Sequence, residues 1–152
     1  MKISNNFIKY SQTIVIVGSV IALISSIFVI KNKYTDYAVI NGYKIKIQIA
    51  DDENERQKGH SNIKSIKDNF GLLFEFDSLG KYPFWNKEMQ FPIDLVWIQG
   101  NTVIGTDYLP KPATSLTTVS PPQEINLVLE INAGLVKKYN IKPGDNIELH
   151  YE

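Results

Sequence analysis

The sequence of 152 residues contains no cysteine. This absence excludes disulfides, a thiolate nucleophile, cysteine-based zinc sites and a cysteine for lipid attachment. Histidine is nearly as scarce, because the chain has only His60 and His150, which lie far apart in the sequence. The chain also lacks a glycine-rich phosphate loop and a Gly-x-Ser-x-Gly nucleophile motif. We therefore expect no histidine-dependent catalyst, no metal site and no resident cofactor.

The chain lacks a basic surface in its larger part. The whole sequence has 16 basic and 16 acidic residues, but residues 1–33 hold four lysines and no acid. Residues 34–152 therefore carry 12 basic and 16 acidic side chains. Because nucleic-acid binding needs clustered lysine and arginine, this acidic balance argues against a nucleic-acid partner.

One long hydrophobic run interrupts the N-terminal part. Residues 13–30 contain no charge, and at about 1.5 Å per residue in a helix they reach about 27 Å, close to the thickness of a bilayer core. The alternative is a cleaved signal peptide, but the run continues through Ile27 to Ile30 directly into Lys31 without a small-x-small exit. An uncleaved membrane anchor is therefore the preferred interpretation.

This anchor sets the predicted domain organisation. We expect residues 1–12 to form a short basic cytoplasmic head and residues 13–30 to cross the membrane. Residues 31–36 are then a linker, and residues 37–152 form a single β-rich domain. Lysines on both sides of the run make the positive-inside bias small, and the basic head favours an extracytoplasmic domain on a single-pass anchor. A secreted or periplasmic domain, released by signal cleavage, is the alternative.

Alternating apolar residues predict many short strands and few helices. Tyr37–Ile40 and Tyr43–Ala50 flank Asn41-Gly42, which is typical of a β-hairpin. Further strands are predicted over residues 71–76, 93–98, 102–109, 125–131 and 146–151. Short helices are predicted over residues 53–58, with Asp51-Asp52 as its cap and Gly59 as its stop, and over residues 133–139, with Asn132 as its cap. This pattern predicts a mainly β, compact and mostly antiparallel barrel or sandwich with two short helices.

An aromatic segment holds the candidate site. Residues 84–95 gather two phenylalanines, Trp85, a methionine and a proline around Lys87 and Asp94. One interpretation is a recessed, aromatic-lined surface where Lys87 and Arg56 meet an anionic group. The other is a core strand that ends at the proline, with Lys87 and Glu88 in solvent.

Asp94 is unusual because it lies between apolar neighbours on a predicted strand. A carboxylate in such a place usually needs a partner, and an arginine fork satisfies both of its oxygens. Arg56, the only arginine in the chain, is the natural candidate. Arg56, Trp85, Lys87 and Asp94 are therefore the candidate ligand-binding residues.

Several short motifs also occur in a suggestive order. They are Glu55-Arg56-x-x-Gly59, Gly71-Leu72-Leu73-Phe74, Phe84-Trp85-x-Lys87, Pro92-Ile93-Asp94-Leu95, Leu129-Glu130-Ile131-x-Ala133-Gly134 and Gly144-Asp145. In this order, residues 37–151 resemble the uncharacterised bacterial and archaeal family called domain of unknown function 192. The sequence departs from the family pattern after Gly59 and after Trp85. The resemblance implies a small β-rich fold, often behind a signal peptide or anchor, and implies no particular activity.

Three functions remain open at this point. The first is a non-enzymatic, membrane-anchored module that binds a small ligand or an envelope partner through the candidate residues. The second is a hydrolase that uses Asp94 or Glu88 with Lys87 or Arg56. The third is a structural domain that docks a partner through the long loop from Pro110 to Pro122.

Overall fold

The computed structural model describes residues 36–112 and 116–151. The expected anchor at residues 13–30 and the basic head before it lie outside the described residues. Within the described part, no helix combines the length and the apolar character needed to cross a bilayer. The anchor and the domain boundaries that depend on it stay predictions.

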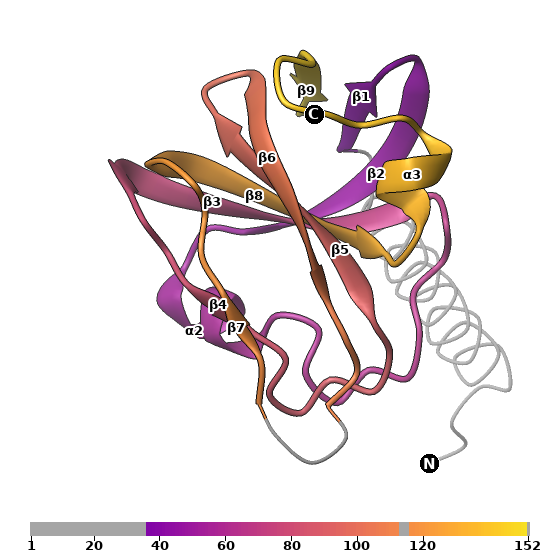
Figure 1. Cartoon of the computed structure of the whole chain (residues 1–152), viewed down its shortest axis with the longest axis vertical. Coiled ribbons are helices and arrows are strands. Elements are labelled where there is room, and N and C mark those ends of the chain that lie inside the picture. Colours follow the sequence, from indigo (N-terminus) through magenta and orange to yellow (C-terminus); the bar gives the residue numbers. More distant parts are fainter. Residues whose placement is uncertain (1–35, 113–115, 152) are drawn as a thin grey trace, which may run out of the picture. The chain divides into compact units, whose positions relative to one another are not determined.

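The described residues form a mainly β structure with two short helices (Figure 1). The strands are β1 (Tyr37–Ile40), β2 (Tyr43–Ala50), β3 (Phe70–Gly80), β4 (Phe84–Trp85), β5 (Ile93–Gln99), β6 (Thr102–Leu109), β7 (Thr118–Val119), β8 (Ile125–Asn132) and β9 (Ile147–His150). The helices are α2 (Glu53–Lys58) and α3 (Leu135–Lys138). The predicted hairpin is confirmed, and Asn41 and Gly42 take the two positive φ angles, 51° and 81°, that its tight turn requires.

Seven strands make one curled sheet in the order β6-β5-β8-β3-β2-β1-β9. All pairs are antiparallel except β2 and β3, which run parallel. The edge strands β6 and β9 approach each other at a bridge between Thr102 and Asn146, beside a 2.9 Å hydrogen bond from Val103 N to Asp145 O. The sheet is therefore a half-barrel, and the short strands β4 and β7 form a second, two-stranded sheet.

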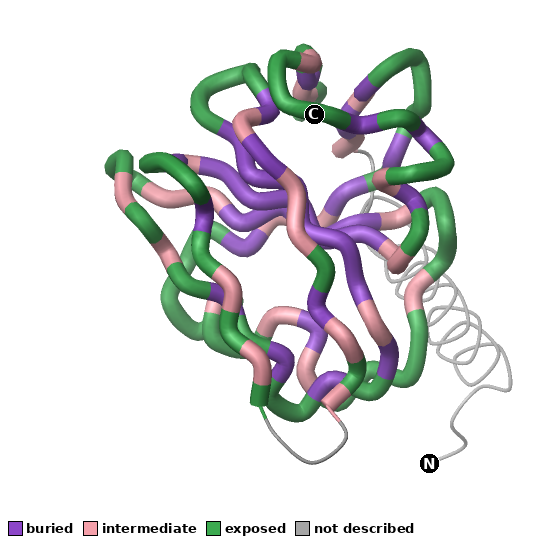
Figure 2. Tube along the Cα trace, in the orientation of Figure 1, coloured by how far each residue is buried: buried purple, intermediate pink, exposed green. Residues whose placement is uncertain are grey.

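Each face of the large sheet carries its own hydrophobic core. The first core includes Ile45, Ile47, Leu73, Val96, Ile98, Leu129 and Ile131, with Leu135 of α3. The second includes Leu72, Phe74, Phe84, Met89, Phe91, Leu95, Trp97 and Val128. Successive side chains of a strand point to opposite faces, so β3, β5 and β8 supply both cores. Figure 2 shows these central strands as the most continuously buried part of the chain.

The two helices begin in different ways. Asp52 caps α2 as predicted, because its side chain accepts a 2.8 Å hydrogen bond from Glu55 N. The predicted cap of α3 is wrong: Gly134, at φ 89°, occupies the cap position and supplies no side chain. Asn132 instead donates a 2.9 Å hydrogen bond to Ile66 O, and thereby fixes the connection before β3.

Candidate functional site

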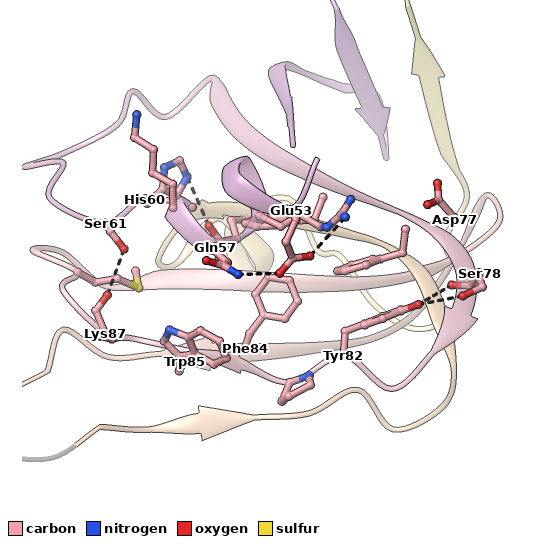
Figure 3. Close-up of a pocket in the computed structure, with 18 residues that line it drawn as sticks. Glu53, Gln57, His60, Ser61, Asp77, Ser78, Tyr82, Phe84, Trp85 and Lys87 are labelled. Atoms are coloured by element: carbon pink, nitrogen blue, oxygen red, sulfur yellow. Dashed lines mark hydrogen bonds and ion pairs between the residues drawn. The ribbon is translucent and has the colours of Figure 1, made fainter. Parts of the chain in front are cut away.

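A pocket of about 390 Å³ opens on the side of the second core. One wall consists of α2 and the residues that follow it, and the opposite wall consists of residues 82–85 with Lys87 and Met89. Strand β3 and Glu130 of β8 complete the lining. Figure 3 shows Glu53, Gln57 and His60 facing Tyr82, Phe84 and Trp85 across the pocket.

Arg56 holds the helical wall in place. Its guanidinium donates hydrogen bonds to the carbonyl oxygens of Asp51 and Glu75, the latter at 2.9 Å, and lies 3.6 Å from a carboxylate oxygen of Glu53. These contacts join the loop before α2, the helix itself and β3. Arg56 therefore lines the pocket as a side chain whose Nη1 already donates two hydrogen bonds and whose Nη2 lies beside an acid.

A stack of flat groups continues from Arg56. Its guanidinium carbon lies 5.4 Å from the centre of the Phe76 ring, and Phe76 stacks on Tyr82 at 3.7 Å between centres and 5° between planes. The Tyr82 hydroxyl donates a 2.9 Å hydrogen bond to Ser78 O. A Cβ atom on Gly80 would lie 2.9 Å from the Tyr82 ring, so the glycine leaves room for this stack. The stack closes one end of the pocket.

The opposite wall combines a buried and an exposed aromatic ring. Phe84 contacts Phe74 and Trp97 edge-on, at 4.9 and 5.5 Å between ring centres, and belongs to the second core. Trp85, the next residue of β4, is 49% exposed and lines the pocket. Alternation along the strand thus buries one ring and offers the other to the pocket.

The buried Asn86 fixes β4 against the long loop after β6. Its side chain donates a 2.8 Å hydrogen bond to Pro110 O and accepts one of 2.9 Å from Thr117 N. Its backbone N–H also donates to Thr117 O at 3.2 Å. The loop thereby supplies β7, which pairs with β4, and supports the wall that carries Trp85.

Lys87 and Ser61 lie at the rim, where Ser61 Oγ donates a 3.4 Å hydrogen bond to Lys87 O. No ion pair joins the ammonium of Lys87 to an acid among the residues that the structure describes. Glu88 is outside the lining, and its carboxylate accepts a 3.2 Å hydrogen bond from the Asn62 side chain. Lys87 is therefore available to an anionic ligand, and Glu88 is not placed to act in the pocket.

Two buried polar side chains meet beneath the pocket. His60 follows the glycine that ends α2, and Glu130 lies in the middle of the large sheet, opposite Leu72 and Leu95. Their side chains are only 3% and 6% exposed, and His60 Nε2 lies 3.7 Å from Glu130 Oε2. Neither of these two atoms, nor His60 Nδ1, has a hydrogen-bond partner within the described part of the chain.

Burial determines the protonation state of this pair. It lowers the pKa of His60 to about 4 and raises the pKa of Glu130 to about 8, because a low-dielectric environment disfavours both charged forms. At neutral pH the contact therefore joins a carboxylic acid to a neutral imidazole rather than two ions. A neutral acid in this setting offers one donor and one acceptor.

The structure brings three of the four predicted site residues together. Arg56, Trp85 and Lys87 all line the pocket. Asp94 does not, because its neighbours on β5, Ile93 and Leu95, belong to the second core, so alternation turns Asp94 to the opposite face of the sheet.

The expected pair between Asp94 and Arg56 is accordingly wrong. Asp94 Oδ2 accepts a 2.9 Å hydrogen bond from Val136 N at the start of α3. Desolvation raises the pKa of Asp94, and hydrogen bonds from the backbone of Val136, Gly134 and Leu135 oppose that rise. Asp94 thus needs a partner, as the sequence indicated, and finds it in a helix start rather than in an arginine.

Sequence reasoning missed His60 and Glu130. Glu130 lies between Leu129 and Ile131 on a predicted strand, which is the same signal that singled out Asp94. The same criterion, an acid between two apolar residues of a strand, therefore identifies Glu130 as a buried acid. His60 gave no comparable signal, because it lies between Gly59 and Ser61 rather than between apolar residues.

Comparisons with known proteins agree with this fold. The model of the family DUF192, described as "Uncharacterized ACR", matches residues 37–149. No curated protein matches the chain. A crystal structure titled as a "putative transcription regulator" from Sinorhizobium meliloti 1021 is similar at 24% identity and TM-score 0.68, over 77% of this chain and 95% of that one. A protein of unknown function from Novosphingobium aromaticivorans DSM 12444 is similar at 23% identity and TM-score 0.68, over 74% and 83%. At these identities the likeness shows the fold alone.

Proposed function

The chain belongs to the DUF192 family, and from the pocket in its family domain we propose that it binds a small molecule with an apolar ring and an anionic group. The observation that carries this proposal is a cavity of about 390 Å³ with aromatic walls and a lysine at its rim. Ligand sites in proteins typically occupy about 300–1,000 Å³ and combine apolar walls with a few polar groups.

The apolar part of the ligand has a defined place. Phe74, Phe84 and Met89 present buried apolar surface to the pocket, and Trp85 offers a half-exposed ring above them. A flat ring inserted here covers Trp85 and contacts the phenylalanines. Burial of apolar surface supplies the main favourable free energy of such binding.

The anionic part belongs at the rim. Lys58, Lys87 and Arg56 line the pocket together with the acids Glu53 and Asp77 and the neutral Glu130. Because Arg56 already contacts Glu53 and two carbonyl oxygens, Lys87 and Lys58 are the cations that remain for a ligand. Positive charge at an exposed rim attracts an anion without the cost of burying a charge.

This arrangement favours binding over the hydrolase considered above. Asp94 faces the other side of the sheet, and the Glu88 carboxylate contacts Asn62 away from the lining. Neither acid is therefore placed beside a molecule that occupies the pocket. Residues 13–30 would tether this binding domain to the membrane, as their length and lack of charge favour, and the basic residues before them favour the outer face.

The proposal is tested by titrating the protein with 4-methylphenylacetate, which carries a flat ring and a carboxylate, and by measuring the dissociation constant calorimetrically. We expect binding that weakens about tenfold in Trp85→Ala and severalfold in Lys87→Met. Tyr108→Ala and Lys64→Met remove an exposed ring and an exposed lysine outside the pocket, and both should leave the affinity unchanged. No binding by the wild-type protein, or equal losses in the control variants, would overturn the proposal.

A further inference from the structure

The most distinctive feature of the pocket is the unpartnered pair beneath it. His60 and Glu130 both line the pocket, and their side chains are more than nine-tenths buried. Three of their polar atoms have no hydrogen-bond partner among residues 36–112 and 116–151. Buried polar groups in proteins are nearly always hydrogen-bonded, and leaving one unpaired costs about 1–3 kcal/mol.

The two side chains do not satisfy each other. Their nearest polar atoms are 3.7 Å apart, which is beyond a hydrogen bond of normal length. Apolar residues lie beside the pair: the His60 ring is 5.8 Å from the Phe91 ring, and Leu72 and Leu95 flank Glu130 on the adjacent strands. Because both residues line the pocket, a polar group bound at its floor can supply a partner where Nε2 of His60 and Oε2 of Glu130 face each other.

From this geometry we infer that the buried end of the ligand is a neutral hydroxyl group, held by Glu130 and His60 at the floor of the pocket. The inference rests on the proposed function and adds the polar group at the far end of the ring. Glu130 and His60 each present a donor and an acceptor in their neutral forms, and a hydroxyl group is the smallest group that both donates and accepts. The ligand class is then an aromatic alcohol or phenol with an anion at its outer end.

Other groups fit this floor less well. A carboxylate brought to the floor would be a buried charge without a cation, because Lys87 and Lys58 are at the exposed rim. A methyl group would fill the space but would leave the three polar atoms unpaired. An ammonium group would be favoured only if Glu130 were ionised in the complex.

A matched pair of probes tests the inference on the full-length chain. 4-Hydroxyphenylacetate and 4-methylphenylacetate have nearly the same size and share the ring and the carboxylate. We expect the hydroxy compound to bind about tenfold more tightly, as one or two additional hydrogen bonds predict. Equal affinities would overturn the inference and leave the proposed function intact, whereas no binding of either compound would overturn both. Tighter binding of 4-(aminomethyl)phenylacetate than of the hydroxy compound would also overturn it.

Variants at Glu130 identify the group that is responsible. Glu130→Gln keeps a neutral donor and acceptor of the same shape and should keep the preference for the hydroxy compound. Glu130→Leu should abolish the preference, by lowering the affinity for the hydroxy compound to that for the methyl compound. If Glu130→Leu does not fold, the imidazole ¹⁵N shifts of His60 in the wild-type protein give a second measurement. They should change with the hydroxy compound and not with the methyl compound, and identical responses would overturn the inference.

Discussion

His60 Nε2 lies 3.7 Å from Glu130 Oε2 at the floor of the pocket, where both side chains are more than nine-tenths buried, and neither atom has a hydrogen-bond partner within the described residues. Burial moves the two pKa values in opposite directions, so both side chains are neutral at pH 7. The pair therefore contributes little electrostatic stabilisation. The pair should instead affect how the free energy of unfolding depends on pH.

The first prediction concerns stability above neutral pH. The pKa of Glu130 is about 8 in the folded protein and about 4.5 in an unfolded chain. Between these values only the folded state holds the proton, so the free energy of unfolding falls as pH rises, by up to about 1.4 kcal/mol per pH unit. Below pH 6.5 His60 has the opposite effect, because its pKa of about 4 lets the unfolded chain bind its proton first. Between pH 4.5 and 6.5 the two residues change the free energy of unfolding in opposite directions. The loss of stability caused by Glu130 should therefore become visible from pH 6.5 to 8.

Urea unfolding at pH 5.5, 6.5 and 8, followed by circular dichroism, measures this effect. Glu130→Gln is the control, because glutamine does not titrate and the decline from pH 6.5 to 8 should disappear. Wild-type and Glu130→Gln proteins that lose the same stability over this interval would show that Glu130 titrates with an ordinary pKa.

The second prediction separates Asp94 from the pocket. Asp94→Ala removes the acceptor of Val136 N and leaves the start of α3 without a cap, which should cost about 1–3 kcal/mol in the free energy of unfolding. Asp94→Asn keeps an acceptor oxygen and should lose less. Both variants should bind 4-methylphenylacetate as the wild type does, because Asp94 faces the other side of the sheet. A tenfold weaker affinity in a folded Asp94→Asn variant would contradict this placement.

The sequence was informative where structure depends on neighbouring residues. The turn at Asn41-Gly42 and the capped helix Glu53–Lys58 were both predicted because backbone conformation and capping act over a few positions. Prediction failed for the start of α3, because its capping oxygen comes from Asp94, on a strand distant in the sequence. Only the packing of β5 against that helix determines this contact.

The candidate site divides in the same way. Trp85 and Lys87 lie on one short segment, so their common wall was predictable from the sequence, and Arg56 was added as the only arginine in the chain. The alternate residues of β5 join two different cores, one on each face of the sheet. Because β5 is apolar on both faces, its sequence does not show which face carries Asp94. The meeting of His60 with Glu130 depends on long-range packing in the same way.

The third prediction concerns Arg56 as a clamp. Arg56→Lys keeps the charge but loses the planar guanidinium, whose Nη1 donates to the carbonyl oxygens of Asp51 and Glu75 while Nη2 lies beside Glu53, and it loses the guanidinium contact with the Phe76 ring. We expect the free energy of unfolding to fall by about 1–2 kcal/mol, measured by urea unfolding. Arg56→Met removes the charge as well and should lose at least as much. Unchanged stability in Arg56→Lys would show that charge alone holds the helix.

The fourth prediction concerns Asn86, which is fully buried and joins β4 to both ends of the loop between Pro110 and Thr117. Asn86→Ala leaves a partly buried carbonyl and a partly buried N–H without their partner, so the free energy of unfolding should fall by about 1–3 kcal/mol. The amide of Thr117 should exchange with deuterium much faster. Affinity for 4-methylphenylacetate should also fall, because β7 no longer holds the wall that carries Trp85.

Asn101→Ala is the matched control for this variant. Its side chain also donates a 2.8 Å hydrogen bond, to Asn146, but in an exposed position where water replaces the lost partner. We expect a change below about 0.5 kcal/mol and unchanged affinity. An Asn86→Ala variant that keeps both its stability and its protection at Thr117 would show that pairing between β4 and β7 alone fixes the loop. A loss of stability without a loss of affinity would instead separate the loop from the pocket, and Trp85 would then owe its position to Phe84 and the core beneath it.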